Sequence, residues 1–398
     1  MKFLIINTDY PDFLHWLYAQ HPGLEDRSYK EQFDVRSESL FGVADFYSAN
    51  LIKLGHEARE LHANNEWIQR AWAREHCLMV HEPATAVRKG ASLLRRVPAF
   101  AASTPVRWLK SCARPLLRLG MEQDDSWFYE VLSAQIKHCK PDVILNQDMG
   151  GVSAMFLGEM KPHYRILIGQ HAATQLTMDS SLQCYDLIIS SFPPTVDYFR
   201  RQGLSAALNR LGFDPRILAR LPPAQQTFDV ALVGSFYDVH SSRVALLNEL
   251  YAKLDRPETI KVWAPTVDHL PVASPIRRHY MGSAWGYQMY EILNASKMTL
   301  NHHGDVLPYA NNMRLFESTG TGTLLITDWK ENLHEMFEPG KEVVTYRNSE
   351  ECVEQIQYYN THEAERQTIA SAGQARTLRD HTYQHRIQEF LSLLGKYT

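Results

Sequence analysis

One stretch of the chain combines residue types that suit the binding of a phosphate and a ribose. It reads NNMRLFESTGTGTLLITDW and covers residues 311–329. Arg314 and Glu317 are three residues apart, so they project from one face of a helix. An arginine can hold a phosphate, and a carboxylate can accept hydrogen bonds from ribose hydroxyls. The same spacing also fits an ordinary intrahelical ion pair, and the stretch by itself leaves both interpretations open.

The elements around this pair are predicted to be a short helix and a buried strand. Asn311 or Asn312 can cap the helix, whose free backbone amides and dipole favour an anion. Gly320 and Gly322 then end the helix, and the apolar run TLLITD follows. We therefore expect a ligand-binding helix beside a sheet.

Composition indicates a globular protein with more than one domain. The chain has 398 residues, of which 44% are hydrophobic and 22% charged, and this length favours two or three domains. A formal net charge of -4 gives no reason to expect nucleic-acid binding. The five cysteines form no Cys-x-x-Cys pair, which favours a reducing cytoplasm over a zinc or disulfide framework. Neither a signal peptide nor a membrane-spanning run is expected.

Apolar runs alternate with amphipathic segments along the chain, which predicts α/β architecture with parallel, doubly wound sheets. The expected strands are KFLIIN, DVILNQD, RILIGQH and DLIISS, then FDVALVGS, IKVWA, KMTLNHHG, TLLITD and EVVTY, with one helix expected over 37–55. Ligands gather beyond the carboxyl ends of parallel strands. Asp9, Asp148 and His171 follow such strands, and each is a candidate general base as well as a candidate structural residue.

A basic and apolar segment interrupts the first half at about residues 83–121. No acidic residue occurs between Glu82 and Glu122, while lysines and arginines alternate with Leu, Val, Phe and Trp. Such a segment can rest on an anionic membrane or hold an acidic acceptor. It can equally form ordinary solvated helices broken by Pro98 and Pro105. Contact with the inner face of a membrane therefore stays one of two interpretations.

The proline-rich segment 211–226 is predicted to link two domains. We expect an N-terminal domain over 1–215, a second domain over 216–378, and a C-terminal helix over 379–398 that packs back on the first domain. His302 and His303 are adjacent on a predicted strand and point to opposite faces. They are not expected to share a metal ion, and no metal site or cofactor is predicted.

The second half resembles a known family of enzymes. The phrases that carry the likeness are FDVALVGSFYDVHSSRVALLNEL, NMRLFESTGTGTLLITDW, LHEMFEPGKEVVTY and the linker phrase GFDP. They are similar to glycosyltransferases of the CgeB type, a branch of the GT-B superfamily. The likeness is good from about Tyr185 onward and weak before it. It implies two Rossmann-like domains that face each other across a cleft.

The resemblance also implies a nucleotide-sugar donor on the second domain. Gly234 and Ser235 would approach the diphosphate, Arg314 would neutralise it, and Glu317 would hold the ribose. Trp263 would flank the base, and the donor set further includes Arg243, Asn301, His302, Asn312 and Phe316. The acceptor would be a carbohydrate, a lipid-linked sugar or a protein, in the synthesis of cell-surface glycans.

One position departs from the family pattern. Many retaining members carry two glutamates at a fixed spacing, and Tyr309 stands where the first would precede Glu317. Retention and inversion therefore both remain open. So do two alternatives to transfer, a nucleotide-sugar epimerase or hydrolase and a non-catalytic sugar-binding or surface-assembly protein.

Overall fold

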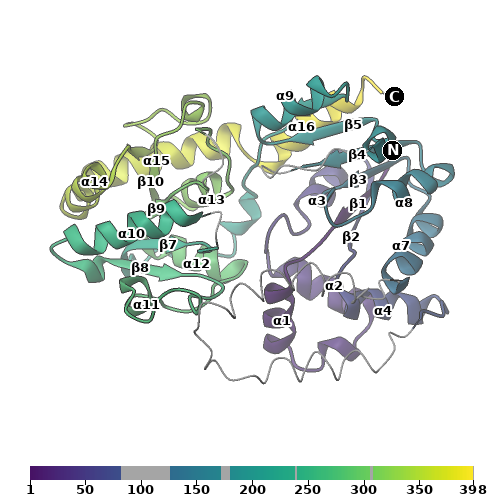
Figure 1. The fold of residues 1–398 in the computed structure, drawn as a ribbon, viewed down its shortest axis with the longest axis horizontal. Coiled ribbons are helices and arrows are strands. Elements are labelled where there is room, and N and C mark those ends of the chain that lie inside the picture. Colours follow the sequence, from purple (N-terminus) through teal and green to yellow (C-terminus); the bar gives the residue numbers. More distant parts are fainter. Residues whose placement is uncertain (82–125, 172–179, 238–239, 305–307, 398) are drawn as a thin grey trace, which may run out of the picture.

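The computed structural model describes residues 1–81, 126–171, 180–237, 240–304 and 308–397. The predicted basic insertion at about 83–121 lies outside these described residues. Within them the chain forms two α/β lobes, which Figure 1 shows side by side, and no helix there is both long and apolar enough to cross a bilayer.

The first lobe is built on a parallel sheet in the order β2-β1-β3-β4-β5-β6. Its core strands are nearly continuous apolar runs, as expected for a sheet that is covered on both faces. The strands are β1 (Lys2–Asn7), β2 (Glu57–His62), β3 (Val143–Asn146), β4 (Ile166–Gln170), β5 (Leu187–Ser190) and β6 (Ala206–Leu208). The helices are α1 (Pro11–Gln20), α2 (Tyr29–Glu38), α3 (Phe46–Lys53), α4 (Glu66–Glu75), α7 (Ser126–Cys139), α8 (Ala154–Glu159) and α9 (Pro193–Arg201).

The second lobe repeats this plan with a sheet in the order β11-β10-β9-β7-β8. Its strands are β7 (Phe228–Val233), β8 (Ile260–Trp263), β9 (Ser296–Asn301), β10 (Leu324–Asp328) and β11 (Val344–Tyr346). Its helices are α10 (Ser241–Lys253), α11 (Pro275–Arg278), α12 (Tyr287–Asn294), α13 (Arg314–Gly320), α14 (Ser349–Thr361) and α15 (Glu363–Asp380), and α16 (Tyr383–Leu394) follows. The predicted pair of parallel-sheet domains is confirmed.

The expected single helix over 37–55 is wrong. The structure has α2 and α3 instead, separated by a loop over 39–45. Leu40, Gly42 and Ala44 all take positive φ angles, of 56°, 62° and 41°, and a right-handed helix cannot contain them. The loop matters for the site because it brings Phe41, Gly42 and Val43 to the gap between the lobes.

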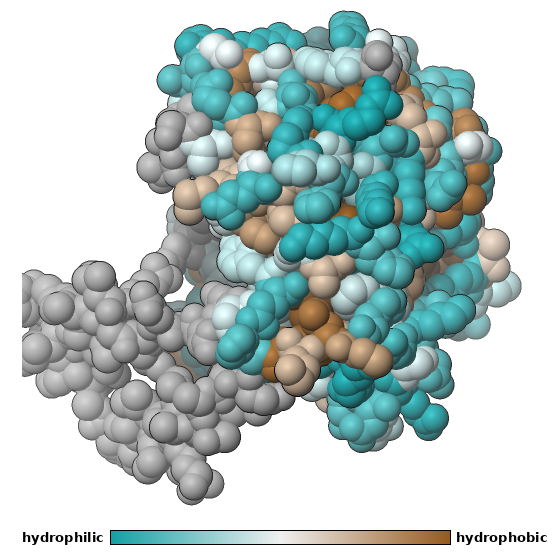
Figure 2. Space-filling view, turned by 90° about the vertical axis from the view of Figure 1, so that its right-hand side faces the viewer, coloured by the Kyte–Doolittle hydropathy of each residue, from teal (hydrophilic) through white to brown (hydrophobic). Residues whose placement is uncertain are grey.

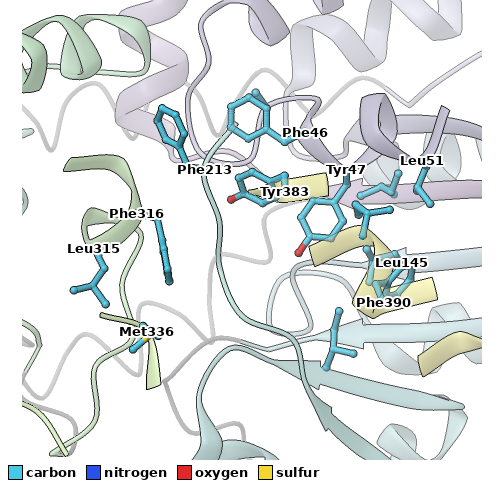
Figure 3. Packing of buried hydrophobic residues seen from close by; sticks show 14 of the residues in the cluster. Phe46, Tyr47, Leu51, Leu145, Phe213, Leu315, Phe316, Met336, Tyr383 and Phe390 are labelled. Atoms are coloured by element: carbon cyan, nitrogen blue, oxygen red, sulfur yellow. The ribbon is translucent and has the colours of Figure 1, made fainter. Parts of the chain in front are cut away.

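The last helix returns from the second lobe and packs on the first (Figure 1). Tyr383 of α16 lies between the rings of Phe46 and Tyr47 of α3, at centroid distances of 5.0 and 5.7 Å (Figure 3). The backbone of Phe213 in the interdomain linker exchanges hydrogen bonds with residues 381 and 383. One buried hydrophobic cluster consequently runs through both lobes, from Phe3 to Phe337.

The outer face of the first lobe is largely hydrophilic. Figure 2 shows it from the right-hand side of Figure 1, with hydrophobic residues only in small groups among polar ones. Large apolar side chains such as Phe3 and Phe199 are fully buried. The stability of this lobe therefore rests on its interior packing and on its junction with α16.

Burial of a carboxyl group in the first lobe predicts a pH-dependent stability. Glu60 on β2 accepts hydrogen bonds from Ser48 N at 2.9 Å and Asn7 Nδ2 at 3.1 Å, and burial raises its pKa from 4.5 to about 8. Nearby Asp45 adds to this rise in pKa, and Arg36 opposes it. Between these two pKa values the folded state keeps a proton that the unfolded state has lost. The free energy of unfolding should therefore fall as pH rises through this window, by up to about 1.4 kcal/mol per pH unit.

The test is urea denaturation of the wild type and Glu60→Gln at a series of pH values across that window. Glu60→Gln should flatten the profile, because glutamine does not titrate. The exposed substitution Glu354→Gln is the control and should keep the wild-type slope. An unchanged slope in Glu60→Gln would show that this carboxyl group does not cause the pH dependence.

The interdomain contact at Gly320 gives a second prediction. A Cβ atom added there would lie 2.5 Å from the ring of Phe213. Gly320→Ala should therefore lower the free energy of unfolding by about 1–3 kcal/mol, the usual cost of overpacking. Gly158→Ala in α8 is the matched control, because its Cβ would meet Cys184 at an ordinary 3.5 Å. Chemical denaturation of both variants checks this, and equal stability of the two would contradict it.

Candidate functional site

A cavity of about 770 Å³ lies where the two lobes meet. It is lined from the carboxyl ends of strands in both sheets, where ligands of such folds gather. From the first lobe come Asn7, Thr8, Asp9, Tyr10, Arg36, Phe41, Gly42, Val43, Gln147, Asp148 and Gln170. From the second lobe come Val233, Gly234, Ser235, His240, Arg243, Met289, Asn301, Asn312, Met313, Arg314 and Glu317.

Arg314 and Glu317 both line this cavity from α13. They form an ion pair with Nη1 and Oε2 2.9 Å apart, and their side chains are only 13% and 7% exposed. Arg314 Nη2 also donates to Val233 O at 3.0 Å, at the end of β7. Burial raises the pKa of Glu317, while Arg314 and a hydrogen bond with Tyr290 oppose that rise. The expected intrahelical pair thus forms, and it forms on a cavity wall.

The start of α13 is held by asparagines. Asn312 Oδ1 accepts from Leu315 N at 3.3 Å, while its Nδ2 donates to Asn301 Oδ1 at 2.9 Å. Asn301 Nδ2 in turn donates to Thr327 Oγ1 at 3.0 Å. These bonds tie the helix to the ends of β9 and β10, so they fix where Arg314 enters the cavity.

Arg243 fixes the loop that follows β7. Its Nη1 donates to Ser235 O at 2.8 Å, and its Nη2 donates to His302 O at 2.5 Å. A Cβ at Gly234 would lie 2.9 Å from Arg243 Nη1, so only glycine leaves this guanidinium in place. The arrangement puts a cation beside Gly234 and Ser235, which line the cavity, and this suits an anionic ligand.

His302 does not line the cavity. Its Nε2 lies 2.9 Å from Ser242 Oγ, and its Nδ1 lies 2.9 Å from the hydroxyl of Tyr346. Tyr346 donates its own proton to Asn301 O, so it accepts from His302 Nδ1. Burial lowers the pKa of His302, which keeps the ring neutral. His302 thereby braces the end of β9 behind the cavity wall.

The predicted strand placement of His302 and His303 is wrong, because β9 ends at Asn301. Both rings lie near Asp328, with His302 Nδ1 3.9 Å from Asp328 Oδ2. His303 is the closer of the two. Its Nδ1 lies 2.7 Å from Asp328 Oδ1. Hydrogen bonding and charge from His303 hold the pKa of Asp328 well below its usual range, against the effect of burial. In the described ranges of the chain, no group of three or more His, Cys, Asp or Glu side chains is placed to hold a metal ion.

Three further predicted site residues lie outside the cavity lining and are buried in protein contacts. Trp263 packs against Phe228 at 5.0 Å, and Phe316 packs against His381 at 5.2 Å. His171 packs edge-on against Phe199 at 5.9 Å. Their roles in binding or catalysis stay predictions.

On the first lobe, Asp9 is engaged by an arginine. Arg36 Nη2 lies 2.5 Å from Asp9 Oδ1, and both side chains are buried. Arg36 and His62 hold the pKa of Asp9 well below its usual range in spite of burial. Arg36 Nη1 also donates to Phe41 O at 3.1 Å, so the pair anchors the loop over 39–45. A carboxylate held in this way is a weak proton acceptor.

Asp148 presents its carboxylate to the cavity in a different setting. Oδ2 accepts from Thr8 Oγ1 at 2.6 Å, and Oδ1 accepts from Gly151 N at 2.8 Å and Gly150 N at 3.2 Å. A Cβ at Gly151 would lie 2.1 Å from Oδ2, so any larger residue here would displace this carboxylate. Two carboxylate oxygens offer about four lone-pair sites, and hydrogen bonds from the described residues occupy three of them.

Residues that sequence reasoning missed reach the cavity through tertiary packing. They are Arg36, the 39–45 loop, His240 and Met289. Arg36 belongs to a polar helix far from any strand end, so its position carries no local signal. Gly42, inside an otherwise helical pattern, was the one available sign of a break.

The second half of the chain resembles known proteins in sequence, and the whole chain resembles solved structures in fold. Residues 220–392 match a family model described as glycosyl transferase-like. No curated protein matches in sequence. Among solved structures, HepE of Anabaena in complex with UDP-glucose has a TM-score of 0.57 at 11% identity, with 100% of both chains covered.

Two other solved structures agree with this likeness. A glycosyltransferase from Rickettsia africae has a TM-score of 0.56 at 8% identity, covering 99% of this chain and 98% of that one. Sucrose-phosphate synthase from Thermosynechococcus elongatus has a TM-score of 0.53 at 11% identity, covering 100% and 99%. The assignment to the CgeB type stays a prediction. The chain has the predicted GT-B fold, and residues 220–392 of its second half match the glycosyl transferase-like family.

Proposed function

We propose that the protein is a glycosyltransferase that uses a nucleotide sugar bound in the interdomain cavity. The observation that carries the proposal is the convergence of Arg314 and Glu317 from one lobe with Asp148 from the other on a single cavity. The match of residues 220–392 to glycosyl transferase-like proteins supports it, as does the likeness to HepE, which was solved with UDP-glucose. The product would enter cell-surface glycans made on the cytoplasmic side of the membrane.

In this proposal the donor lies on the second lobe. Arg314 neutralises the diphosphate, and the backbone of Gly234 and Ser235 approaches it beside Arg243. Glu317 accepts hydrogen bonds from the ribose hydroxyls, for which it would exchange part of its contact with Arg314. Fixed guanidinium groups can stabilise the charge that develops on a departing diphosphate, so no metal ion is required.

The acceptor reacts from the first lobe. Its hydroxyl oxygen forms a bond to the anomeric carbon of the donor sugar, and the bond from that carbon to the diphosphate breaks. The electron pair leaves with the nucleoside diphosphate, and the hydroxyl proton passes to Asp148. Asp148 suits this role better than His171 or Asp9, because His171 does not line the cavity and Asp9 is paired with Arg36.

Conservative variants of the donor residues test the binding site. A thermal-shift screen against UDP-, GDP-, dTDP- and CMP-sugars first identifies a ligand that raises the melting temperature. Arg314→Lys keeps a cation beside Glu317 but loses the planar fork, and Glu317→Gln loses the charged acceptor. Each should weaken binding of that nucleotide sugar about tenfold or more in calorimetry, the usual cost of a charge-assisted hydrogen bond.

The same substitutions at exposed positions outside the cavity are the controls. Arg347→Lys and Glu354→Gln should leave the affinity unchanged. If Arg314→Lys and Glu317→Gln bind the nucleotide sugar as the wild type does, the donor site is assigned wrongly.

Asp148→Asn tests the proposed proton acceptor. Loss of general base assistance should lower kcat about 100-fold or more and leave donor affinity within about twofold. Asparagine keeps an oxygen that accepts hydrogen bonds, so the loop should survive, as circular dichroism can verify. If the wild type releases nucleoside diphosphate without any acceptor as fast as it does with one, the protein is instead a hydrolase.

A further inference from the structure

The wall of the cavity that belongs to the first lobe has its own chemical character. Among the residues described there, the side chains of Asn7, Thr8, Gln147 and Gln170 are neutral and polar. Gln147 Nε2 donates to Gln170 Oε1 at 2.9 Å, which holds the two amides side by side. Amide and hydroxyl groups both donate and accept hydrogen bonds, as sugar hydroxyls do.

The charges on this wall do not favour an anion. Arg36 is the one cationic side chain that the described first-lobe residues contribute to the lining, and it is already paired with Asp9. Asp148 forms no ion pair with any described residue, so it adds a negative charge to the wall. A phosphate or carboxylate on the acceptor would be repelled here rather than bound.

An exposed aromatic side chain belongs to the same wall. Tyr10 follows Asp9 directly, and it is 67% exposed although it lines the cavity. Its ring meets the ring of Phe41 at 5.8 Å, edge to face, so its orientation is supported from the loop over 39–45. An exposed aromatic ring at the edge of a cavity offers a flat apolar surface to a ligand. The flat C–H face of a pyranose is a suitable partner for such a ring.

We propose that the first-lobe wall binds a neutral carbohydrate acceptor, with Tyr10 as the surface on which one of its sugar rings stacks. This inference rests on the proposed function, and it narrows the acceptor to a glycan. A lipid-linked sugar would bring its diphosphate toward a wall with no unpaired cation among its described residues. A lone serine or asparagine of a protein acceptor would offer no sugar face to Tyr10.

The test is binding of the full chain to an array of glycans. The array holds neutral gluco-, galacto- and manno-oligosaccharides together with counterparts that carry uronic acids or phosphate. The wild type should bind at least one neutral glycan more tightly than its acidic counterpart. Binding should persist in about 0.5 M salt, because screening by salt weakens only charge-based recognition.

Variants then locate the contact by calorimetry with the glycan that the array selects. Tyr10→Ala should weaken binding about five- to tenfold, the range expected for a ring contact, while Tyr10→Phe should bind as the wild type does. Tyr358→Ala removes a tyrosine that is 42% exposed on α14, far from this wall in sequence, and should have no effect.

Three outcomes would overturn the inference. They are preferential, salt-sensitive binding of acidic glycans, no binding of any neutral glycan, and neutral-glycan binding that Tyr10→Ala leaves intact. Nucleotide-sugar binding is measured on the same samples. If no nucleotide sugar binds, the proposed function itself fails. If one binds in an Arg314-dependent manner and no neutral glycan does, only the acceptor assignment fails.

Discussion

The cavity depends on one hydrophobic cluster that spans both lobes. A sheet edge by itself offers a shallow surface, and the ligand-binding ends of the two sheets become a cavity only when they are held face to face. Tyr383 of α16 packs on Phe46 and Tyr47, and the cluster continues to Phe316 and Met336 of the second lobe (Figure 3). The position of Arg314 relative to Asp148 is therefore fixed by this hydrophobic cluster as a whole and not by any single loop.

Electrostatic pairing divides the cavity into walls of different character. On the first lobe Arg36 neutralises Asp9, and on the second Arg314 neutralises Glu317. Buried charges are tolerated because they are paired, and the pairs also fix their side chains. Both side chains of the Arg314 pair line the cavity, and in the proposed function a phosphate and a ribose replace part of the pair. The Arg36 pair instead anchors a loop through Phe41 O.

The sequence predicted the fold well because its buried strands are continuous apolar runs. It missed β2, a polar edge strand, and the three-residue β6, for which local pattern is weak. In the site, Asp148 was predicted because it follows a strand end. Arg314 and Glu317 were predicted from their residue types and spacing on a helix, and Gly234 from the family resemblance. Trp263 and His171 also lie at strand ends, yet their rings point into the protein interior. A position at a strand end does not show whether a side chain points into the cavity or into the interior. Arg36 reaches the cavity only through tertiary packing.

The return of α16 to the first lobe has a consequence for the order in which the protein matures. The backbone of Phe213 forms a β-bridge with Thr382, and Phe390 packs on Phe3 of β1. During synthesis the ribosome completes the whole second lobe before it makes Thr382 and Phe390, which pack against the first lobe. Until then the first lobe keeps a hydrophobic surface exposed. Such surfaces on unfinished chains bind chaperones and promote aggregation. The final packing of the first lobe is thus among the last steps by which a newly made molecule matures.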